Sequence, residues 1–190
     1  MKTGLLTKLR VLLSVTAGAT LLAAAGAASA YTITAPNPAS DIPSGSPDPI
    51  CWGVGTGNDP DFMTGCGLGS LTQIFKQDAG GGESGSLAPN YKATFSNGPD
   101  GSLANALVVW EGGNFLDCTI DCYVMIKDGD ADPGRYLYNL KGLWNGTDDL
   151  IMTGFWVNPA KGAISHVAFY GGVTDCPRGD PKCTPTRIPE

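Results

Sequence analysis

The sequence has one histidine among its 190 residues, and this scarcity limits the chemistry open to the protein. A zinc site takes its ligands mainly from cysteine and histidine, and the chain offers no second histidine and no C-x-x-C pair. The G-x-S-x-G elbow of an α/β-hydrolase is also absent. Basic residues are few, 12 against 18 acidic ones, so the chain lacks the basic patch that nucleic acid or anionic lipid requires.

Long apolar runs are confined to the first thirty residues. Lys2, Lys8 and Arg10 precede a small, alanine-rich stretch at 11–27, and small side chains at 28–30 suit a signal peptidase. The stretch is short against the roughly 20 apolar residues that span a membrane, which disfavours a retained anchor. We predict a bacterial Sec-type signal cleaved after Ala30, a secreted or cell-envelope protein, and no membrane span in the mature chain.

The mature chain would hold 160 residues, enough for a single hydrophobic core. Removal of the signal takes three basic residues with it, so the formal charge falls from −6 to −9. We expect residues 31–175 to form one monomeric domain and residues 176–190 to form a Cys- and Pro-rich tail. The acidic charge predicts that nucleic acid is not a partner.

All six cysteines follow the signal, and an even number in an exported chain favours disulfides over free thiols. Fifteen pairings are possible in principle. The positions fall into three local couples, so we predict sequential pairing of Cys51 with Cys66, Cys118 with Cys122, and Cys176 with Cys183.

Beyond the signal, short apolar segments alternate with turns, and no 3.6-residue apolar period occurs. Gly, Pro, Asn, Asp and Ser fill residues 36–49 and 78–90, which we predict to be loops. Seven segments have the composition of strands: 71–76, 91–96, 105–110, 122–127, 135–140, 149–157 and 164–170. Together they predict an all-β chain without a helix, folded as an antiparallel β-sandwich or jelly-roll-like single domain.

Alternation along a strand predicts which side chains share a face. In 122–127 the even-numbered residues are expected on one face and the odd-numbered ones on the other. In 164–170, Ile164 and His166 are expected on the same face, opposite Ser165. Ser165 and His166 then cannot form a nucleophile–base pair, and we interpret His166 as a structural residue bonded to a loop or a cross-strand neighbour. Residues 106–110 are apolar on both faces and predict a central strand.

The stretch CYVMIKDGDADPGRYLYNLKGLWNGTDDLIMTGFWVNPAKGAISHVAFYGG, residues 122–172, resembles part of a known protein group. A KDG turn followed by proline and tyrosine, a WNGT turn, a GFW strand and a GAISH strand resemble, in this order, the C-terminal half of exported bacterial proteins that bear a PEP-CTERM sorting tail. The resemblance implies an envelope or extracellular location linked to exopolysaccharide, and no established enzymatic activity.

The sorting tail of that group resembles Pro-Glu-Pro followed by an apolar span and arginines. Here the sequence reaches Ile188, Pro189 and Glu190 and stops. We therefore expect the sorting tail to be missing or cut after Glu190. Without such a tail the protein would be released rather than transiently anchored.

An acidic loop offers a candidate calcium site, because Asp128, Asp130 and Asp132 alternate as ligands do in calcium-binding loops. Pro133 stands where an EF-hand has glycine, and Asn139 stands where it has a bidentate glutamate. A solvated acidic hairpin loop is the alternative. Ca²⁺ is the one cofactor that the sequence suggests.

Aromatic side chains offer a candidate carbohydrate site, because they can stack on sugar rings. Trp144, beside a tight turn, is the one expected to be exposed and to bind polysaccharide. Aromatic residues within strands belong more often to the core. The other aromatic candidates are Trp110, Tyr136, Tyr138 and Trp156.

These features predict a non-catalytic exported protein of the cell surface or extracellular matrix, associated with exopolysaccharide. The alternatives are a secreted polysaccharide hydrolase and a calcium-dependent carbohydrate-binding module. A glycoside hydrolase needs two carboxylates that flank a cleft, and Glu111, Asp148 and Asp149 form no recognisable pair. No catalytic residue is therefore assigned.

Overall fold

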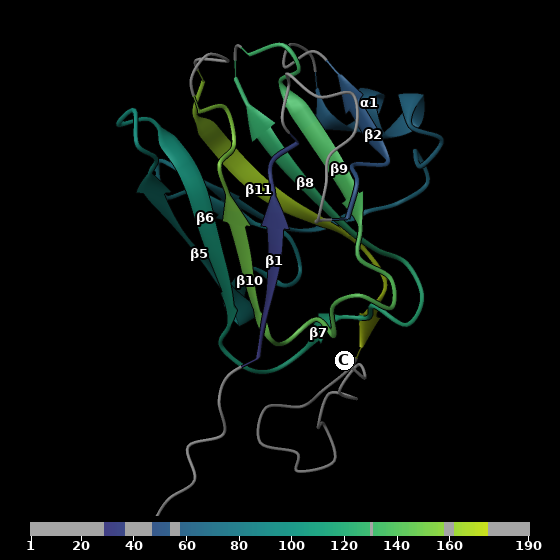
Figure 1. The fold of residues 1–190 in the computed structure, drawn as a ribbon. Helices are drawn as coiled ribbons and strands as arrows, with labels where there is room; N and C mark the ends of the chain where they lie inside the picture. Colours follow the sequence, from purple (N-terminus) through teal and green to yellow (C-terminus); the bar gives the residue numbers. More distant parts are fainter. Residues whose placement is uncertain (1–28, 37–46, 54–57, 130, 158–161, 175–190) are drawn as a thin grey trace, which may run out of the picture.

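The computed structural model describes residues 29–36, 47–53, 58–129, 131–157 and 162–174, which form two facing β-sheets (Figure 1). The four-stranded sheet A has the order β1-β10-β6-β5, with bounds Ala30–Thr34, Asp149–Thr153, Leu103–Trp110 and Tyr91–Asn97. The six-stranded sheet B has the order β2-β9-β8-β11-β3-β4, with bounds Cys51–Gly53, Arg135–Asn139, Cys122–Asp128, Ile164–Gly171, Gln73–Asp78 and Glu83–Ser84. A small third sheet pairs β12 (Val173–Thr174) with β7 (Phe115–Leu116).

This architecture confirms the predicted all-β class. Each of the seven predicted strands is formed, as β3, β5, β6, β8, β9, β10 and β11. Strand β6 lies between β10 and β5, which confirms that its apolar sequence marks a central strand. Strand β10 ends at Thr153 rather than at residue 157, because Gly154 and Trp156 turn the chain with φ angles of 76° and 53°. The jelly-roll topology stays a prediction.

The prediction that the chain has no helix is wrong, because α1 spans Asp59–Gly65. The Asn58 side chain caps it by accepting a hydrogen bond from the Asp61 backbone N–H at 2.8 Å, and Pro60 lies in the first turn. Seven residues make about two turns, which is too short to show a 3.6-residue period. A short 3₁₀ helix, η1, spans Ala88–Asn90.

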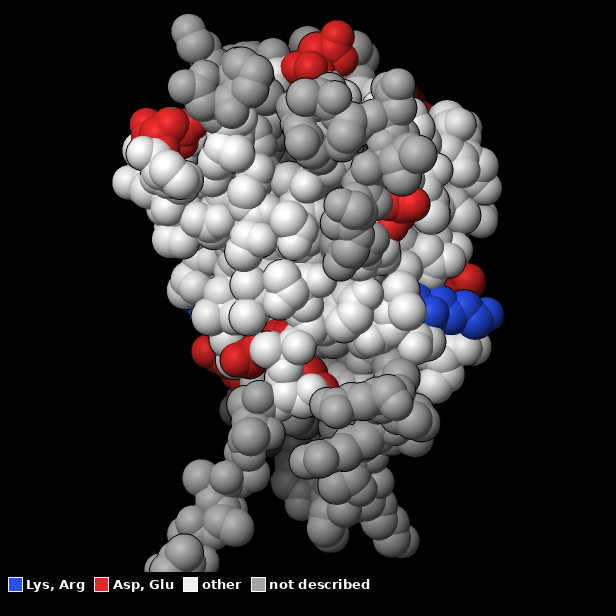
Figure 2. Space-filling model, viewed as in Figure 1, with Lys and Arg blue, Asp and Glu red and all other residues white. Residues whose placement is uncertain are grey.

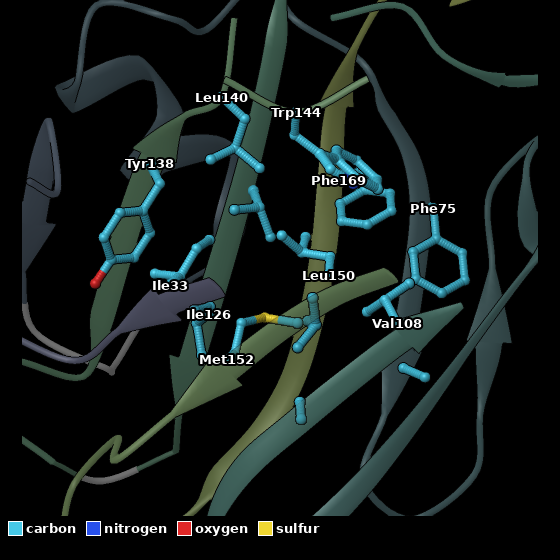
Figure 3. Packing of buried hydrophobic residues seen from close by; sticks show 14 of the residues in the cluster. Ile33, Phe75, Val108, Ile126, Tyr138, Leu140, Trp144, Leu150, Met152 and Phe169 are labelled. Atoms are coloured by element: carbon cyan, nitrogen blue, oxygen red, sulfur yellow. The ribbon is translucent and has the colours of Figure 1, made fainter. Parts of the chain in front are cut away.

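The main hydrophobic core fills the space between the two sheets (Figure 3). Both sheets contribute fully buried side chains: Ile33, Val108, Leu150 and Met152 from sheet A, and Phe75, Ile126, Tyr138 and Phe169 from sheet B. The rings of Phe75, Tyr91 and Phe169 pack with centroids 5.1 to 5.6 Å apart. Removal of this apolar surface from water is the dominant favourable term in folding.

A second apolar cluster lies on the outer face of sheet B, beneath α1. Its buried members are Met63, Tyr123, Met125, Leu137, Ala168 and Tyr170. In β8 the odd-numbered apolar residues join this cluster while the even-numbered ones join the main core, as the alternation predicted. Strand β8 is therefore buried on both faces, because α1 covers the side that would otherwise meet water.

Strand β11 contains an irregularity in its ladder. Because of it, the prediction that Ile164 and His166 share one face is wrong. Ile164 lies opposite Asp128 and His166 lies opposite Lys127, so Ser165 is an extra residue in the ladder. Such a bulge changes the alternation locally. Ile164 therefore joins the main core, whereas His166 contacts α1 on the outer face. The Ser165 hydroxyl donates a hydrogen bond to the Lys127 carbonyl at 3.0 Å.

Two disulfides join Cys51 to Cys66 and Cys118 to Cys122, in the sequential pairing predicted. The first ties β2 to the C-terminal end of α1, and the second closes a small loop before β8. Disulfides are typical of chains that fold in an oxidising compartment. Cys176 and Cys183 lie outside the described residues, as do residues 1–28 of the predicted signal and the tail. In the described part of the chain, no helix is long and apolar enough to cross a membrane.

Candidate functional site

Three basic side chains gather on the outer face of sheet B because their strands are neighbours in register. Lys127 of β8 lies opposite Arg135 of β9 on one side and opposite His166 of β11 on the other. Like charges placed directly opposite one another destabilise a sheet. A compensating carboxylate is therefore needed at this point, and α1 supplies it with its first residue, Asp59.

The Asp59 carboxylate contacts all three basic side chains. Its Oδ1 lies 3.1 Å from Lys127 Nζ and 3.3 Å from Arg135 Nη2. Its Oδ2 lies 3.1 Å from His166 Nε2. This contact does not have the geometry of a hydrogen bond. We call Asp59, Lys127, Arg135 and His166 the Asp59 cluster.

The Asp59 cluster is largely shielded from solvent, which strengthens its electrostatics. The four side chains are between 3% and 16% exposed. Burial by itself would raise the pKa of Asp59, but the contacts with His166 and Lys127 outweigh it and hold that pKa well below its usual range. Asp59 is therefore ionised at any ordinary pH.

The Asp59 cluster also reaches the edge strand β2 through Phe62 of α1. The Arg135 guanidinium carbon lies 5.4 Å from the centre of the Phe62 ring, which is a cation–π contact. The same ring packs against β2, where a Cβ added at Gly53 would lie 3.3 Å from it. The cluster, α1 and β2 therefore form one connected unit, which the Cys51–Cys66 disulfide closes.

His166 is buried, but its Nε2 makes no hydrogen bond within the described part of the chain, so the predicted bonding to a loop or a cross-strand neighbour stays a prediction. Its side chain is 5% exposed, and its Nδ1 lies 3.8 Å from Oδ1 of Asp78, its cross-strand neighbour on β3. A ring so placed does not reach an external substrate. The Asp59 cluster thus acts within the protein, where it clamps α1 onto sheet B.

The predicted calcium ligands are only partly described, because Asp130 lies outside the described residues. Asp128 is 5% exposed, and its carboxylate accepts hydrogen bonds from the backbone N–H groups of Ala131 at 3.3 Å and Ala163 at 2.5 Å. These bonds tie together the loops next to β8 and β11, while Asp132 is exposed. Among the described residues, no three His, Cys, Asp or Glu side chains are grouped so as to hold a metal ion. Calcium binding stays a prediction.

The expected exposure of Trp144 is wrong. Its side chain is 2% exposed, and its Nε1 donates a hydrogen bond to the Asp148 carbonyl at 2.9 Å. The turn at Gly146, with a φ of 83°, folds the indole inward until its ring centre lies 5.5 Å from that of Phe169 (Figure 3). A sugar cannot reach it, so a carbohydrate site cannot rest on Trp144. Tyr136, Tyr138 and Trp156 are likewise buried, and Trp110 is half-buried.

An exposed tryptophan does occur, on the edge strand β2. Trp52 is 62% exposed and Ile50 is 50% exposed. Exposure alternates here, since Asp48, Ile50 and Trp52 are exposed while Pro49 and Cys51 are half-buried. Side chains that alternate with period two share one face of an extended chain. We call Asp48, Ile50 and Trp52 the β2 strip.

The β2 strip was not among the predicted sites, because two prolines, Pro47 and Pro49, mark the segment as a loop and only three residues follow in the strand. The strip is nevertheless held in place. Trp52 lies opposite Tyr136 of β9, and Cys51 lies opposite Leu137 and is bridged to Cys66. The alternation of Ile50, Cys51 and Trp52 was the available signal, although it covers too few residues to stand out.

The candidate glycosidase carboxylates lie at one end of sheet A. Asp149 is the first residue of β10, Asp148 precedes it, and Glu111 follows the last residue of the antiparallel neighbour β6. Glu111 is exposed, whereas Asp148 and Asp149 are half-buried. Figure 1 shows the start of β10 at the opposite end of the molecule from β2. A sugar on the β2 strip would therefore not be presented to these carboxylates.

The arrangement can thus do two things: the Asp59 cluster fixes α1, and the β2 strip offers an aromatic surface to solvent. Comparisons with protein-family models, with curated proteins and with solved structures find no match to the chain.

Proposed function

We propose that the protein is an exported, non-catalytic module that holds neutral polysaccharide outside the cell on its β2 strip. The observation that carries this proposal is the exposure of Trp52, 62% open to solvent on an edge strand. An indole in water is unfavourably solvated, and a sugar ring can cover it with its apolar C–H face while water is released. Trp52 takes the role that the sequence assigned to Trp144.

The rest of the β2 strip suits an uncharged sugar chain. Residues 48 and 52 are separated by about 13 Å in an extended strand, so the strip can follow more than one sugar ring. Ile50 extends the apolar surface, and the Asp48 carboxylate can accept hydrogen bonds from sugar hydroxyls. The formal charge of −9 after signal removal opposes polyanionic ligands.

Three features support a location outside the cell. The first thirty residues have the pattern of a secretory signal. The two disulfides suit an oxidising compartment. The resemblance of residues 122–172 to exported PEP-CTERM proteins adds a link to exopolysaccharide. The ligand in this proposal is accordingly a polymer of the cell surface or matrix.

The non-catalytic role is supported by the position of His166, which is enclosed in the Asp59 cluster. The two alternatives are separable by experiment. A hydrolase would release reducing sugar from a bound polymer, and Glu111→Gln or Asp149→Asn would abolish that release. A calcium-dependent module would lose its retention in a chelator such as EDTA, whereas binding by the β2 strip would persist.

Replacement of Trp52 tests the proposal directly. We expect Trp52→Ala to weaken retention on neutral polysaccharide about tenfold, the effect of losing one stacking contact of about 1.4 kcal/mol. Retention is measured by affinity electrophoresis in gels that contain a panel of neutral and acidic polysaccharides, with thermal unfolding recorded alongside. The thermal midpoint should stay nearly unchanged, because the indole is exposed.

Leu143→Ala is the matched control, since Leu143 is 45% exposed in the turn after β9 and lies outside the β2 strip. This variant should be retained like the unchanged protein. Equal retention of Trp52→Ala and the unchanged protein would contradict the site, and no retention on any neutral polymer would contradict the function.

A further inference from the structure

The four edge strands of the two sheets differ in how well they are protected. Sheet A has the edges β1 and β5, and sheet B has the edges β2 and β4. An edge strand presents backbone N–H and C=O groups that can pair with another chain. Natural proteins block such pairing with short strands, charged side chains, prolines or bulges. Three of the four edges here have one of these features, and β1 has none.

The three protected edges can be described one by one. Strand β4 has only two residues, and its Glu83 forms an ion pair with Lys92 of β5. Strand β5 carries that lysine and has a register shift between Ser96 and Asn97. Strand β2 has three residues and is preceded by Pro49. None of these strands offers a long, regular, uncharged edge.

Strand β1 is different in composition and in pairing. Its five residues, Ala30–Thr34, include no charge and no proline, and they pair with β10 from end to end without a register shift. The pairing is parallel, and no described strand lies beyond β1 in sheet A. Figure 2 shows that the described surface over the middle of β1 and β10 is free of charged side chains.

The backbone of β1 directs alternate residues toward and away from β10. The Ser29 carbonyl accepts a hydrogen bond from the Asp149 N–H at 3.2 Å, and the Ala35 N–H donates one to the Thr153 carbonyl at 2.9 Å. Odd-numbered residues therefore face β10, so the backbone groups of even-numbered residues such as Thr32 point away from it. The Thr32 side chain is exposed to solvent.

We propose that β1 is a self-association edge that pairs with β1 of a second copy, antiparallel and about a two-fold axis at Thr32. In this register Thr32 faces its own copy and Tyr31 faces Ile33, and both pairs lie within the predicted mature chain that begins at Tyr31. Threonine pairs and aromatic pairs with β-branched residues are favourable across strands. The half-buried Tyr31 gains further cover from the partner copy, and the two sheets A become one continuous sheet.

A two-fold pairing of this kind uses the same surface on both copies and closes on itself. The short edge at residues 31–34 that remains after the predicted cleavage buries little area, so the dimer is weak and forms only at high local concentration. This departs from the monomer that the sequence predicts. It does not depend on sugar binding, although a dimer would carry two β2 strips and so bind a polymer with higher avidity.

Placing a charge at the proposed two-fold axis tests this pairing. In Thr32→Lys the two ammonium groups would face each other, so we expect self-association to weaken at least tenfold. Sedimentation velocity of the exported protein, up to about 1 mM, measures the association. The unchanged protein should dimerise reversibly, and circular dichroism should show Thr32→Lys to be folded, because a lysine stem can run out to solvent from this edge position.

Thr94→Lys is the matched control, because Thr94 is an exposed threonine on β5, the opposite edge of sheet A. It should associate like the unchanged protein. Hydrogen exchange adds a second measurement: the Thr32 amide should become more protected as the protein concentration rises. A chain that stays monomeric at every concentration overturns the proposal. So does a dimer that Thr32→Lys leaves intact, because that dimer would use another surface.

Discussion

At the scale of single residues, Asp59 has the strongest electrostatic role in the described part of the chain. Its carboxylate is the counter-charge for Lys127 and Arg135, which are neighbours in the sheet, and it also contacts His166. Removing one partner from a shielded ion pair leaves the others uncompensated, which costs more than the pair itself contributes. The stability of the outer face of sheet B therefore depends on this one charge.

We expect Asp59→Asn to lower the free energy of unfolding by about 3 kcal/mol at neutral pH. The folded-state pKa of Asp59 is lowered, so its stabilising contribution is complete above the unfolded pKa of about 4 and is lost as the pH falls toward the folded pKa. The stability difference between the two proteins should therefore be constant above about pH 5 and shrink below about pH 4.

Urea unfolding curves between about pH 2 and pH 7 measure this difference. Asp61→Asn is the control, because Asp61 is exposed on the same helix and should change stability by no more than about 0.5 kcal/mol. A loss in Asp59→Asn that does not exceed the loss in Asp61→Asn would show that the Asp59 cluster does not clamp α1.

At the scale of elements, the strands of the central sheets could be predicted because each has enough residues to show its pattern. Strand β8 alternates over seven residues between two apolar clusters. Strand β2 and helix α1 have three and seven residues, too few for a period to stand out. Pro49 ends the predicted loop that precedes β2, and Pro60 is a favourable first-turn residue of α1.

Two errors concern where side chains point, and both have a physical cause outside the local sequence. The extra Ser165 in β11 is defined only relative to β8 and β3, so alternation within β11 alone placed Ile164 on the wrong face. Trp144 was expected outside because it precedes a turn. The turn instead closes over the core, where the indole finds a carbonyl partner. The exposed tryptophan, Trp52, lies just after the predicted loop 36–49, in a strand of three residues that was not predicted.

The connection between β9 and β10 allows a matched test of how tightly a turn is packed. Gly146 has a φ of 83°, and a Cβ added there would lie 2.1 Å from the Leu116 carbonyl oxygen. Gly142, in the same connection, has a φ of 70° and no atom within 4 Å of such a Cβ. Only the backbone strain is common to the two positions.

We therefore expect Gly142→Ala to cost about 1 kcal/mol, the strain of a left-handed backbone. Gly146→Ala should cost about 2 to 4 kcal/mol, because steric overlap adds to that strain. Its carbonyl also accepts the hydrogen bond from the buried Tyr91 hydroxyl, which the shift would disturb. Thermal and urea unfolding measure both variants. Similar losses in the two would show that the turn moves freely away from β7.

At the scale of the whole molecule, net charge and the uncharged edge have opposite effects on association. A formal charge of −9 after signal removal keeps copies apart in dilute solution. Close approach is then easiest where charge is absent, as over β1 in Figure 2. Association should accordingly strengthen with added salt, which screens the repulsion between copies. A matrix offers both salt and high local concentration.

The sequence predicts that export and oxidation go together, because the predicted signal ends where β1 begins and every cysteine follows it. We expect protein collected from the periplasm or the medium to begin at Tyr31 and to gain the mass of six hydrogen atoms when its six cysteines are reduced. Intact mass before and after reduction, with N-terminal sequencing, measures both.

The same chain produced without residues 2–30 is the control, because the reducing cytoplasm should leave its thiols free. Its stability should be lower, since each missing disulfide removes roughly 2 to 3 kcal/mol in the chain-entropy model. A free thiol in the denatured, non-reduced exported protein would contradict the sequential pairing of all six cysteines. An intact signal on exported protein would contradict cleavage after Ala30.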